Sequence, residues 1–481
     1  MSSPNISFKS IPSSIRKPGR YTEYNADGAI SSLPVIANKI LVIGQKTSSG
    51  IAVVNTAYPI FSTADSVLYA GAGSIADLTI KALLKANPYA NVSMVCQADA
   101  DGAAPAAGTI TVTVTATKAG SIDVWIANKQ INIAVAIGDT PTVVAAALLA
   151  KINEILVDLP ITAAVEVGVL TLTAKCKGLQ GNQIAIASKV TTTDVVLTNV
   201  QPTGGTGDPV YTAALTAVFP GKYNIIVSTL NDATNLGSLK THLNNLSAPT
   251  ESRPAIGVYG YVGIQATIIT LAGTTLNSER LTVGFHPYTK TTQGGHSLDY
   301  EVAGAYAGVI ASEEDPAMPL NGLPLVGIAP AAIANRLSRS QQESCLAGGV
   351  TPLEVGSGEQ VVIVRAVSNY ITNASGTTDP TYLDITTIKT LDYVRLAIET
   401  RESLRFSRSK LSTKTPKAVR TQIIDVLKQL EGLEIVENVD KNLDGVIVER
   451  DSTDNNRLNA LIPADVVNGL HVLANRIDLI L

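Results

Sequence analysis

The sequence predicts an α/β core whose mainly parallel sheet is covered by helices, together with an inserted β-rich domain and extended N- and C-terminal arms. Three observations support this fold class. Apolar strand-like runs alternate with helix-length segments before residue 98 and again after residue 207. All 15 Tyr and 5 Phe lie outside residues 90–210, where Thr and Val alternate instead. Both ends carry spaced apolar residues without a helical period.

Composition limits the classes of protein to consider. A chain of 481 residues, 45% hydrophobic and 16% charged, is long enough for two to four domains. A net charge of −4 argues against a general nucleic-acid binder. We expect no signal peptide and no membrane insertion, because no apolar run reaches about 18 residues. Three widely spaced cysteines indicate neither a disulfide framework nor a zinc site, which fits a reducing cytoplasm.

Residues 1–30 are predicted to form the N-terminal arm. Ile6, Phe8, Ile11 and Ile15 are spread among Ser, Pro, Lys and Arg, with prolines at positions 4, 12 and 18. Such a segment is extended and cannot bury its own apolar side chains. A frayed terminus is the simpler interpretation, but the regular spacing favours docking on another surface.

Residues 31–97 begin the α/β core, with strands expected at 40–43, 67–69 and 92–97 and a helix at 75–86. Between them, Gly71-x-Gly73-x-x-Ala76 is close to a dinucleotide-binding fingerprint. The expected acidic residue after a following strand is missing. We therefore favour Ser74 as an ordinary N-cap and keep a nucleotide site as the weaker alternative.

Residues 98–207 are predicted to be the inserted domain, bounded by soft linkers at each end. Strands are expected at 109–117, 121–127, 130–136, 165–174, 183–188 and 194–200, and Thr140 caps a helix that ends near residue 156. We expect this domain to fold apart from the core, so that a short linker in place of residues 99–206 leaves a folded protein.

Residues 208–335 return to the α/β pattern and are expected to complete the domain begun by residues 31–97. Strands are predicted at 223–229, 255–261 and 280–285. Helices are predicted up to residue 246 and at 265–272 and 298–311. Gly304 and Gly308 would let the last of these helices pack closely. Residues 316–335 are rich in Pro and Gly and are expected to be loop.

Residues 336–463 are predicted to form a C-terminal α/β domain around a long helix at 384–406, with Asp384 as its N-cap. A shorter helix at 339–347, strands at 353–355 and 360–366, a helix at 416–430 and a strand at 445–449 complete it. The long helix begins with an apolar seam and continues it as a basic stripe that we expect to meet an acidic surface; a solvated helix end is an equally good interpretation. The stripe consists of Arg401, Arg405 and Arg408, extended by Lys410 and Lys414.

Residues 464–481 form the predicted C-terminal arm. A strand at its end would place Ile477, Leu479 and Leu481 on one face. A lone hydrophobic strand is an aggregation hazard unless it pairs with the edge of another sheet. We therefore predict that both arms make intersubunit contacts, through Ile6, Phe8, Ile11 and Ile15 at one end and these three residues at the other.

No catalytic, cofactor-binding or metal-binding constellation is found. The four histidines lack metal-ligand spacing, and no G-x-S-x-G motif is present. His296 near Asp299 resembles part of a hydrolase triad only superficially.

Several stretches, in order, resemble the tail sheath protein of Mu-like contractile-tailed bacteriophages. They are IPSSIRKPGRYTEYN at 11–25, YNIIVSTLND at 223–232, GIAPAAIANRLSRSQQESCLAGGVTPLEV at 327–355, TYLDITTIKTLDYVRLAIETRESLRFSRSKL at 381–411 and RLNALIPADVVNGLHVLANRIDLIL at 457–481. They bracket nearly the whole chain outside residues 98–210, where the resemblance is weakest.

The resemblance implies a structural protein of the virion with a sheath-type, subtilisin-like core and no enzymatic activity. It implies stacked six-fold rings around a tail tube, which contract to drive the tube through the host envelope. It also implies baseplate and tail terminator partners, assembly in the host bacterial cytoplasm, no cofactor, a basic stripe that faces the tube, and arms that link neighbouring subunits. The insertion would form the outer part. The alternatives are the sheath of a phage-derived bacteriocin or injection system, a nucleotide-dependent α/β enzyme and, more remotely, a β-rich surface adhesin.

Overall fold

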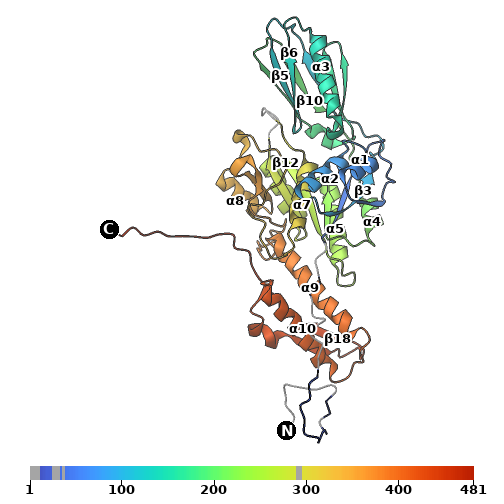
Figure 1. Cartoon of the computed structure of the whole chain (residues 1–481), viewed down its shortest axis with the longest axis vertical. Helices are drawn as coiled ribbons and strands as arrows, with labels where there is room; N and C mark the ends of the chain where they lie inside the picture. The colour runs from blue at the N-terminus through green and yellow to red at the C-terminus, as the bar shows by residue number, and fades with distance from the viewer. Residues whose placement is uncertain (1–10, 13, 24–32, 35–37, 289–294, 481) are drawn as a thin grey trace. The chain divides into compact units, whose positions relative to one another are not determined.

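The computed structural model describes residues 11–12, 14–23, 33–34, 38–288 and 295–480. The chain divides into two compact units, which are described separately (Figure 1). The larger unit comprises Ile36–Tyr393, Glu434–Glu437 and Ala464–Leu481. The smaller unit comprises Met1–Val35, Val394–Leu433 and Asn438–Pro463. Among the described residues, no helix is both long enough and apolar enough to cross a membrane.

An eight-stranded sheet forms the centre of the larger unit, in the order β15-β14-β13-β12-β11-β1-β3-β2. In chain order, its strands are β1 (Lys39–Gln45), β2 (Ala57–Ile60), β3 (Asn91–Gln97), β11 (Ile225–Ser228), β12 (Ile256–Gly263), β13 (Leu281–Pro287), β14 (Thr351–Val355) and β15 (Val361–Ile363). All adjacent pairs are parallel except the two at the edges, β2–β3 and β14–β15. The prediction of a mainly parallel sheet is confirmed.

Strand β1 joins the parts of the sheet that precede and follow the insertion. Ile40 lies opposite Val92 of β3 on one side and Ile225 of β11 on the other. Ile40 and Val42 point into one hydrophobic cluster, whereas Leu41 and Ile43 point into another. A strand buried on both faces needs an unbroken apolar run, which is the pattern in this part of the sequence.

Helices cover both faces of the sheet. One cluster contains α1 (Thr63–Ala70), α2 (Ile75–Ala86) and α7 (Asp299–Ser312). The other contains α4 (Thr212–Val218), α5 (Ala233–Ser247), α6 (Gln265–Ile269), the π-helix η3 (Thr270–Leu276) and α8 (Arg339–Ala347). Gly304 and Gly308 of α7 lie against the backbone of α2, where a Cβ would clash with the carbonyl oxygens of Thr79 and Leu83. The predicted close packing of α7 is confirmed.

Two sequence-based expectations about this unit are wrong. Residues 67–69 belong to α1, whose Ser62 N-cap and Asp65 form a capping box that favours helix over strand. The expected domain boundary at residue 335 falls within the fold, because β14 and β15 extend the main sheet beside β13. Residues 316–335 are largely loop as predicted, with the short 3-10 turn η4 (Ile333–Asn335); another, η5 (Ser357–Glu359), precedes β15.

The insertion contains two antiparallel sheets and one long helix. The four-stranded sheet has the order β10-β4-β8-β7 and the three-stranded sheet the order β6-β5-β9. Its elements are β4 (Ala107–Val112), β5 (Gly120–Ile126), β6 (Lys129–Val135), α3 (Pro141–Glu154), η1 (Leu156–Asp158), β7 (Ile161–Glu166), β8 (Val169–Ala174), η2 (Leu179–Gln183), β9 (Ile186–Thr191) and β10 (Leu197–Thr203). The side chain of Thr140 accepts a hydrogen bond from the Val143 amide, so the predicted cap of α3 is confirmed.

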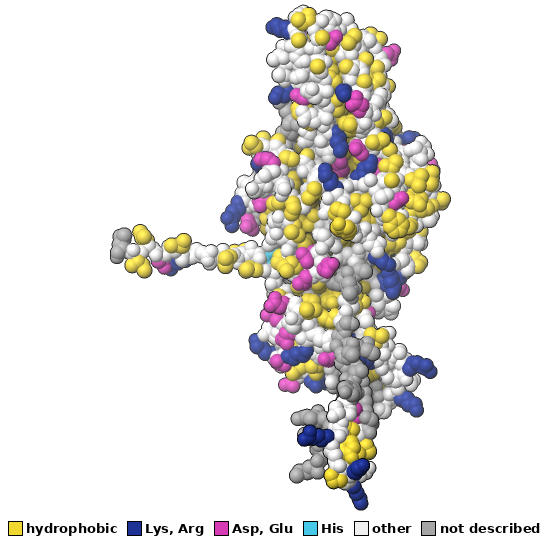
Figure 2. Space-filling model, viewed as in Figure 1, with side chains coloured by type: hydrophobic (Ala, Val, Ile, Leu, Met, Phe, Trp, Pro, Cys, Tyr) yellow, Lys and Arg dark blue, Asp and Glu magenta, His cyan; other side chains and the backbone are white. Residues whose placement is uncertain are grey.

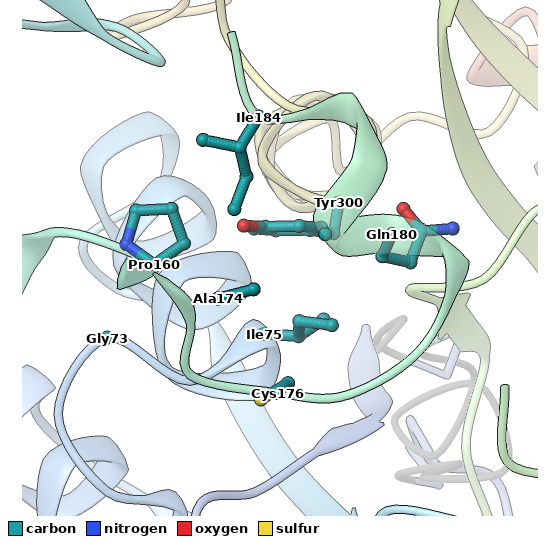
Figure 3. A pocket seen from close by; sticks show the side chains of 9 residues that line it. Gly73, Ile75, Pro160, Ala174, Cys176, Gln180, Ile184 and Tyr300 are labelled. Atoms are coloured by element: carbon teal, nitrogen blue, oxygen red, sulfur yellow. The ribbon is translucent and has the colours of Figure 1, made fainter. Parts of the chain in front are cut away.

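The insertion meets the core at a joint that is apolar at its centre. Figure 3 shows Tyr300 of α7 and Ile75 of α2 facing Pro160, Ala174 and Ile184 of the insertion. Ile75, Leu78, Leu298 and Tyr300 belong to the same buried cluster as the insertion's own interior. Four residues of the α/β domain therefore complete the insertion's hydrophobic cluster, which argues against the expectation that the insertion folds apart.

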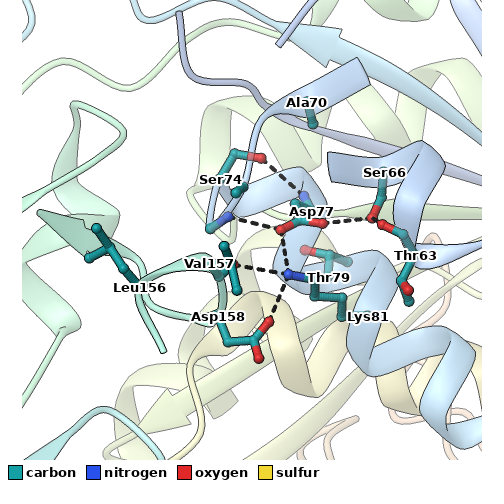
Figure 4. Close-up of polar contacts among 12 residues, drawn as sticks. Thr63, Ser66, Ala70, Ser74, Asp77, Thr79, Lys81, Leu156, Val157 and Asp158 are labelled. Atoms are coloured by element: carbon teal, nitrogen blue, oxygen red, sulfur yellow. Dashed lines mark hydrogen bonds and ion pairs between the residues drawn. The ribbon is translucent and has the colours of Figure 1, made fainter. Parts of the chain in front are cut away.

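A charged network also crosses this joint (Figure 4). The ammonium of Lys81 on α2 lies 2.9 Å from the carboxylate of the buried Asp77 and 2.8 Å from that of Asp158 on the insertion. Burial opposes the charge of Lys81, but the hydrogen bonds to the two carboxylates outweigh burial and raise its pKa. Asp77 also accepts hydrogen bonds from Ser66 Oγ and from the Gly73 amide. Two helices and the insertion thus meet at one ion-pair network.

The smaller unit is built mainly from helices. The long helix α9 (Ile385–Phe406) starts in the larger unit and contributes its second half here, beside α10 (Thr415–Gly432). The unit also contains η6 (Asp440–Gly445) and the hairpin of β17 (Ile447–Arg450) and β18 (Leu458–Leu461). The short strands β16 (Val436–Glu437) and β19 (Asp465–Val466) pair within the larger unit. The predicted span of the long helix is confirmed, but the Asp384 carboxylate binds the Arg365 guanidinium and does not cap the helix.

Candidate assembly surfaces

The C-terminal arm is attached to the larger unit by its first residues. Val466 of β19 lies opposite Val436 of β16. Asn321 Nδ2 donates a hydrogen bond of 2.8 Å to Nδ1 of His471, whose Nε2 lies 3.5 Å from Asp384. Beyond residue 471, every described residue of the arm is exposed. The arm therefore leaves the body at His471.

The exposed part of the arm is apolar and extended (Figures 1 and 2). Leu470, Val472, Leu473, Ile477, Leu479 and Ile480 are all exposed, and Ile477 is 94% exposed. The structure assigns no strand to residues 470–480, and Leu481 lies outside the described residues. An isolated strand has no partner for its backbone hydrogen bonds, so the predicted strand requires a second sheet. Exposed apolar side chains of this kind are typical of a segment that binds to another surface.

The N-terminal arm is described only in part. Ile6 and Phe8 lie outside the described residues. The Ile11 amide donates to the Glu23 carboxylate, and Ile15 is exposed. The predicted contacts of Ile6, Phe8, Ile11 and Ile15 stay predictions.

The predicted basic stripe needs a correction at its first member. Arg401 is only 5% exposed, and its guanidinium donates to the carboxylate of Asp425 and to the side chains of Gln422 and Gln429 on α10. The charge of Arg401 is therefore paired inside the smaller unit. The sequence pattern does not reveal that α10 packs on α9 at this point. Arg405, Arg408, Lys410 and Lys414 are exposed. No acidic residue occurs from 403 to 424, so these four cations, named here the basic segment, form a local positive surface.

The β17–β18 hairpin is a second candidate surface that sequence reasoning largely missed. Ile447 lies opposite Leu461, and both side chains are exposed. Among the described residues, neither strand pairs with a third strand. Arg420 of α10 fixes the hairpin by donating to the carbonyl oxygens of Leu443 and Val446. Only the strand at 445–449 was predicted; its partner lacks a clear alternating pattern.

The dinucleotide-like motif is not built as a nucleotide site. The segment before Gly71 is helix α1, and Ser74 accepts a hydrogen bond from the Asp77 amide as an N-cap. A Cβ on Gly73 would meet the Leu159 carbonyl oxygen and the Lys175 ammonium, so the insertion fills the space that a pyrophosphate would need. The N-cap interpretation is confirmed.

His296 and Asp299 serve separate structural roles. The His296 ring stacks on Tyr288 at 3.9 Å between centroids. The buried Asp299 accepts hydrogen bonds from the Val262 amide and Asn231 Nδ2, at 2.5 and 2.6 Å, and burial raises the pKa of its carboxyl to about 7. Among the described residues, no group of three His, Cys, Asp or Glu side chains could hold a metal ion.

Comparisons of the sequence find tail sheath proteins along the whole chain. A family profile described as the phage tail sheath protein central domain matches residues 204–369, and one described as the phage tail sheath C-terminal domain matches residues 377–480. Together they cover more than half of the chain. The Mu-like prophage FluMu tail sheath protein of Haemophilus influenzae is 29% identical, over 99% of this chain and 100% of its own length.

Solved structures agree at the level of fold. A sheath tail protein from Listeria innocua has a TM-score of 0.51 and 13% identity, covering 92% of this chain and 94% of its own. The sheath of an extracellular contractile injection system in its contracted state has a TM-score of 0.51 and 11% identity, covering 96% of this chain and 98% of its own. The contracted helical sheath of the anti-feeding prophage has a TM-score of 0.50 and 14% identity, covering 96% of this chain and 99% of its own.

Proposed function

This chain belongs to the phage tail sheath family, and we propose that its copies form stacked six-fold rings around a tail tube. It is a structural component of the contractile tail, and so of the virion, and not an enzyme. The observation that carries the proposal beyond the family is the C-terminal arm, which is anchored at His471 and then exposes one apolar side chain after another. Such an arm gains stability only by docking on another copy.

We infer that the arm adds a strand to the β17–β18 hairpin of a neighbouring copy. The hairpin offers open edges, and a two-stranded sheet is marginally stable until further strands join it. Exposed Ile447 and Leu461 supply apolar surface for Ile477, Leu479 and Leu481 of the arm. The N-terminal arm, with Ile6, Phe8, Ile11 and Ile15, is proposed to join the same sheet. Linked arms would keep the lattice connected while the rings move during contraction.

The basic segment is proposed to face the tail tube. Its four exposed cations lie on one stretch of chain, and no Asp or Glu occurs from residue 403 to residue 424, which suits an acidic tube surface. Each exposed ion pair contributes only about 0.2–1 kcal/mol, so the attraction would come from many subunits acting together. Arg401 is left out of the proposed tube contact, because its guanidinium is paired with Asp425. The proposed contact residues are Arg405, Arg408, Lys410 and Lys414.

Further parts of the proposal concern the assembly as a whole. We propose that the core has a subtilisin-like topology, which the covered parallel sheet supports. Contraction would drive the tube through the host envelope, with baseplate and tail terminator proteins at the two ends, after assembly in the host cytoplasm. A phage-derived bacteriocin or injection system would use the same subunit in another genetic context.

Removing the arm tests the central proposal. A chain that ends at residue 469 loses the contacts of His471 with Asn321 and Asp384. Since residues 472–480 are exposed, it should still be a folded, soluble monomer, and it should form no tubes in electron microscopy. The matched control replaces Arg476 and Asp478 by Gln and Asn, which keeps the apolar pattern and should assemble normally. Tubes of normal length from the truncated chain would contradict the role of the arm.

A charge reversal tests the basic segment. Changing Arg408, Lys410 and Lys414 to Glu should prevent the sheath from coating purified tail tubes while leaving the melting temperature of the monomer unchanged. Arg339→Glu on α8 is a control for added negative charge elsewhere. Normal coating by the triple variant at low and at high salt would refute a role of these cations in tube binding.

A further inference from the structure

The loop between α9 and α10, residues 407–414, carries most of the basic segment and is held by hydrogen bonds. Within the loop, the Ser412 amide donates to the Lys410 carbonyl oxygen at 3.0 Å. Two side chains from outside the loop, Thr415 and Arg450, also bind its backbone. Each backbone residue that is fixed in one conformation loses conformational entropy, so a surface loop is ordered only where such bonds hold it.

Thr415 is the first residue of α10, but its hydroxyl group bonds to the loop and not to the helix. It donates a hydrogen bond of 2.7 Å to the Lys410 carbonyl oxygen and accepts one of 2.9 Å from the Ser412 amide. Lys414, at the N-cap position, makes no side-chain capping bond, and its amide donates to the Ser412 hydroxyl oxygen at 3.3 Å. Ser412 and Thr415 therefore fix the backbone of both lysines.

Arg450 reaches the same loop from the β17–β18 hairpin. Its Nη2 donates a hydrogen bond of 2.7 Å to the carbonyl oxygen of Leu411, which is 39 residues away in the chain. Arg450 is the last residue of β17 and lies opposite Leu458 of β18, so the hairpin fixes its backbone. The hairpin lies against α10 (Figure 1), to which Arg420 attaches it. The loop is thus bound to a second element of the smaller unit.

These bonds fix the backbone of the loop and leave its charged groups available. Within the described residues, the ammonium groups of Lys410 and Lys414 make no ion pair or hydrogen bond, and both side chains are exposed. A loop that is ordered before binding loses less conformational entropy when a partner binds. An ordered backbone with unpaired cations is therefore suited to an acidic partner surface.

Two simpler roles explain these bonds less well. A side chain that caps α10 would accept hydrogen bonds from amides of its first turn, whereas Thr415 binds atoms that precede the helix. Arg450 is exposed, so burial of its side chain adds little to the stability of the unit. Arg450 is also a cation, but Thr415 is neutral. A shared effect of the two residues would therefore separate positioning from charge.

We propose that Thr415 and Arg450 are positioning residues for tube binding, which hold residues 410–414 in the conformation that meets an acidic tube surface. The inference rests on the proposed tube contact of the basic segment. It adds that this contact depends on the order of the backbone as well as on charge. Because β17 is also part of the proposed acceptor of a neighbouring arm, Arg450 fixes the tube-facing loop to the hairpin through which copies are linked.

Cosedimentation of full-length variants with purified tail tubes tests the role of Thr415. Thr415→Val removes the hydroxyl group and keeps both the charge and the branched shape, and it should lower the affinity for tubes about tenfold. Thr415→Ser keeps the hydroxyl group and should bind like the wild type. The melting temperatures of both monomers should be unchanged. Wild-type affinity of Thr415→Val would overturn the proposal.

A pair of arginine variants tests the role of Arg450. Arg450→Gln should weaken tube binding as much as Thr415→Val does. The matched control is Arg457→Gln, which removes an exposed cation from the same hairpin; the Arg457 guanidinium donates to Asn459 Oδ1 and not to the loop. Equal losses of affinity for the two arginine variants would show that only the charge of the hairpin matters, and would overturn the role of Arg450.

Hydrogen exchange reports the order of the loop without any tube. In the free chain, Thr415→Val and Arg450→Gln should both speed the exchange of the Ser412 amide, while the amides of α9 keep their protection. Exchange of the loop amides at the wild-type rate would mean that the two side chains do not order the loop, and would overturn the proposal.

The tube contact and its positioning can fail separately. If the charge-reversed variant of Arg408, Lys410 and Lys414 coats tubes normally, the proposed tube contact fails, and the positioning role fails with it. If charge reversal prevents coating but Thr415→Val and Arg450→Gln bind tubes like the wild type, the tube contact stands and only the positioning role is refuted.

Discussion

The insertion and the C-terminal arm are both additions to the α/β core, yet they are attached in opposite ways. The insertion enters and leaves through Gly-rich linkers, but Ile75, Leu78 and Tyr300 of the core are buried in its hydrophobic cluster. The arm is held by a two-residue strand pair and by His471, and then exposes its apolar side chains. The difference teaches that soft linkers do not imply a movable domain. What decides mobility is how much apolar surface the joint buries.

The largest expected effect comes from removing the insertion. Replacing residues 99–206 by a short Gly/Ser linker should abolish the cooperative thermal transition, because it would expose Ile75, Leu78 and Tyr300. Each exposed side chain should lower the free energy of unfolding by about 1.5–3 kcal/mol. Circular dichroism and calorimetry would measure the transition. The arm truncation is the matched comparison and should keep its transition. A cooperative melt of the insertion-deleted chain at the wild-type temperature would show that the joint does not stabilise the core.

A smaller effect concerns the pH dependence of the joint. Asp299 is buried between Leu298 and Tyr300, which belong to the hydrophobic cluster of the insertion, and burial raises the pKa of its carboxyl from 3.8 to about 7. Between these values the folded state holds a proton that the unfolded state has released, so stability should fall as pH rises through this window, by about 4 kcal/mol at most. Asp299→Asn cannot ionise and should lose this part of the profile.

Denaturant unfolding from pH 4 to pH 8 would compare the two proteins. Asp478 of the arm is exposed, so Asp478→Asn serves as the control and should follow the wild-type profile. Parallel curves for the wild type and Asp299→Asn would show that the Asp299 carboxyl is not the source of the pH dependence.

The smallest expected effect compares one ion pair from each region. Lys81→Met breaks the contact with Asp158 and leaves the buried Asp77 without its cation, so it should lower the free energy of unfolding by about 1–3 kcal/mol. Arg476→Met breaks the pair with Asp478 in the arm, where both side chains are exposed, and should change stability by less than the error of the measurement. Urea unfolding would measure both free energies. Equal changes for Lys81→Met and Arg476→Met would show that ion pairs stabilise the joint of the insertion no more than they stabilise the arm.

Much of the fold could be predicted from the sequence because it depends on local patterns. The apolar run at 40–43 indicates a strand buried on both faces, the helix at 75–86 has Ser74 as its cap, and α9 has an uninterrupted helical period. The absence of aromatic side chains other than Trp125 from residues 90–210 marked the insertion correctly. In each case the deciding interaction lies within a few residues along the chain, so composition and spacing record it.

The misses share a different cause. Residues 67–69 look like a strand by composition, yet the Ser62–Asp65 capping box begins a helix there. Arg401 continues the spacing of an exposed stripe, but α10 brings Asp425 to it from 24 residues away. The candidate surfaces show the same division: the spaced apolar residues of the arm are visible in the sequence, whereas the pairing of β17 with β18 is not.

By itself, the sequence determined the α/β class, the position of the insertion, the long helix and the apolar character of the C-terminal arm, which has no local segment to bury it. Only the tertiary structure decided that residues of α2 and α7 complete the hydrophobic cluster of the insertion, that Arg401 is buried, and that β17 and β18 pair as a two-stranded sheet. The physical reason is the range of the interactions. Hydrogen-bond periodicity and capping act between near neighbours in the chain, but burial and ion pairing depend on which distant surfaces meet.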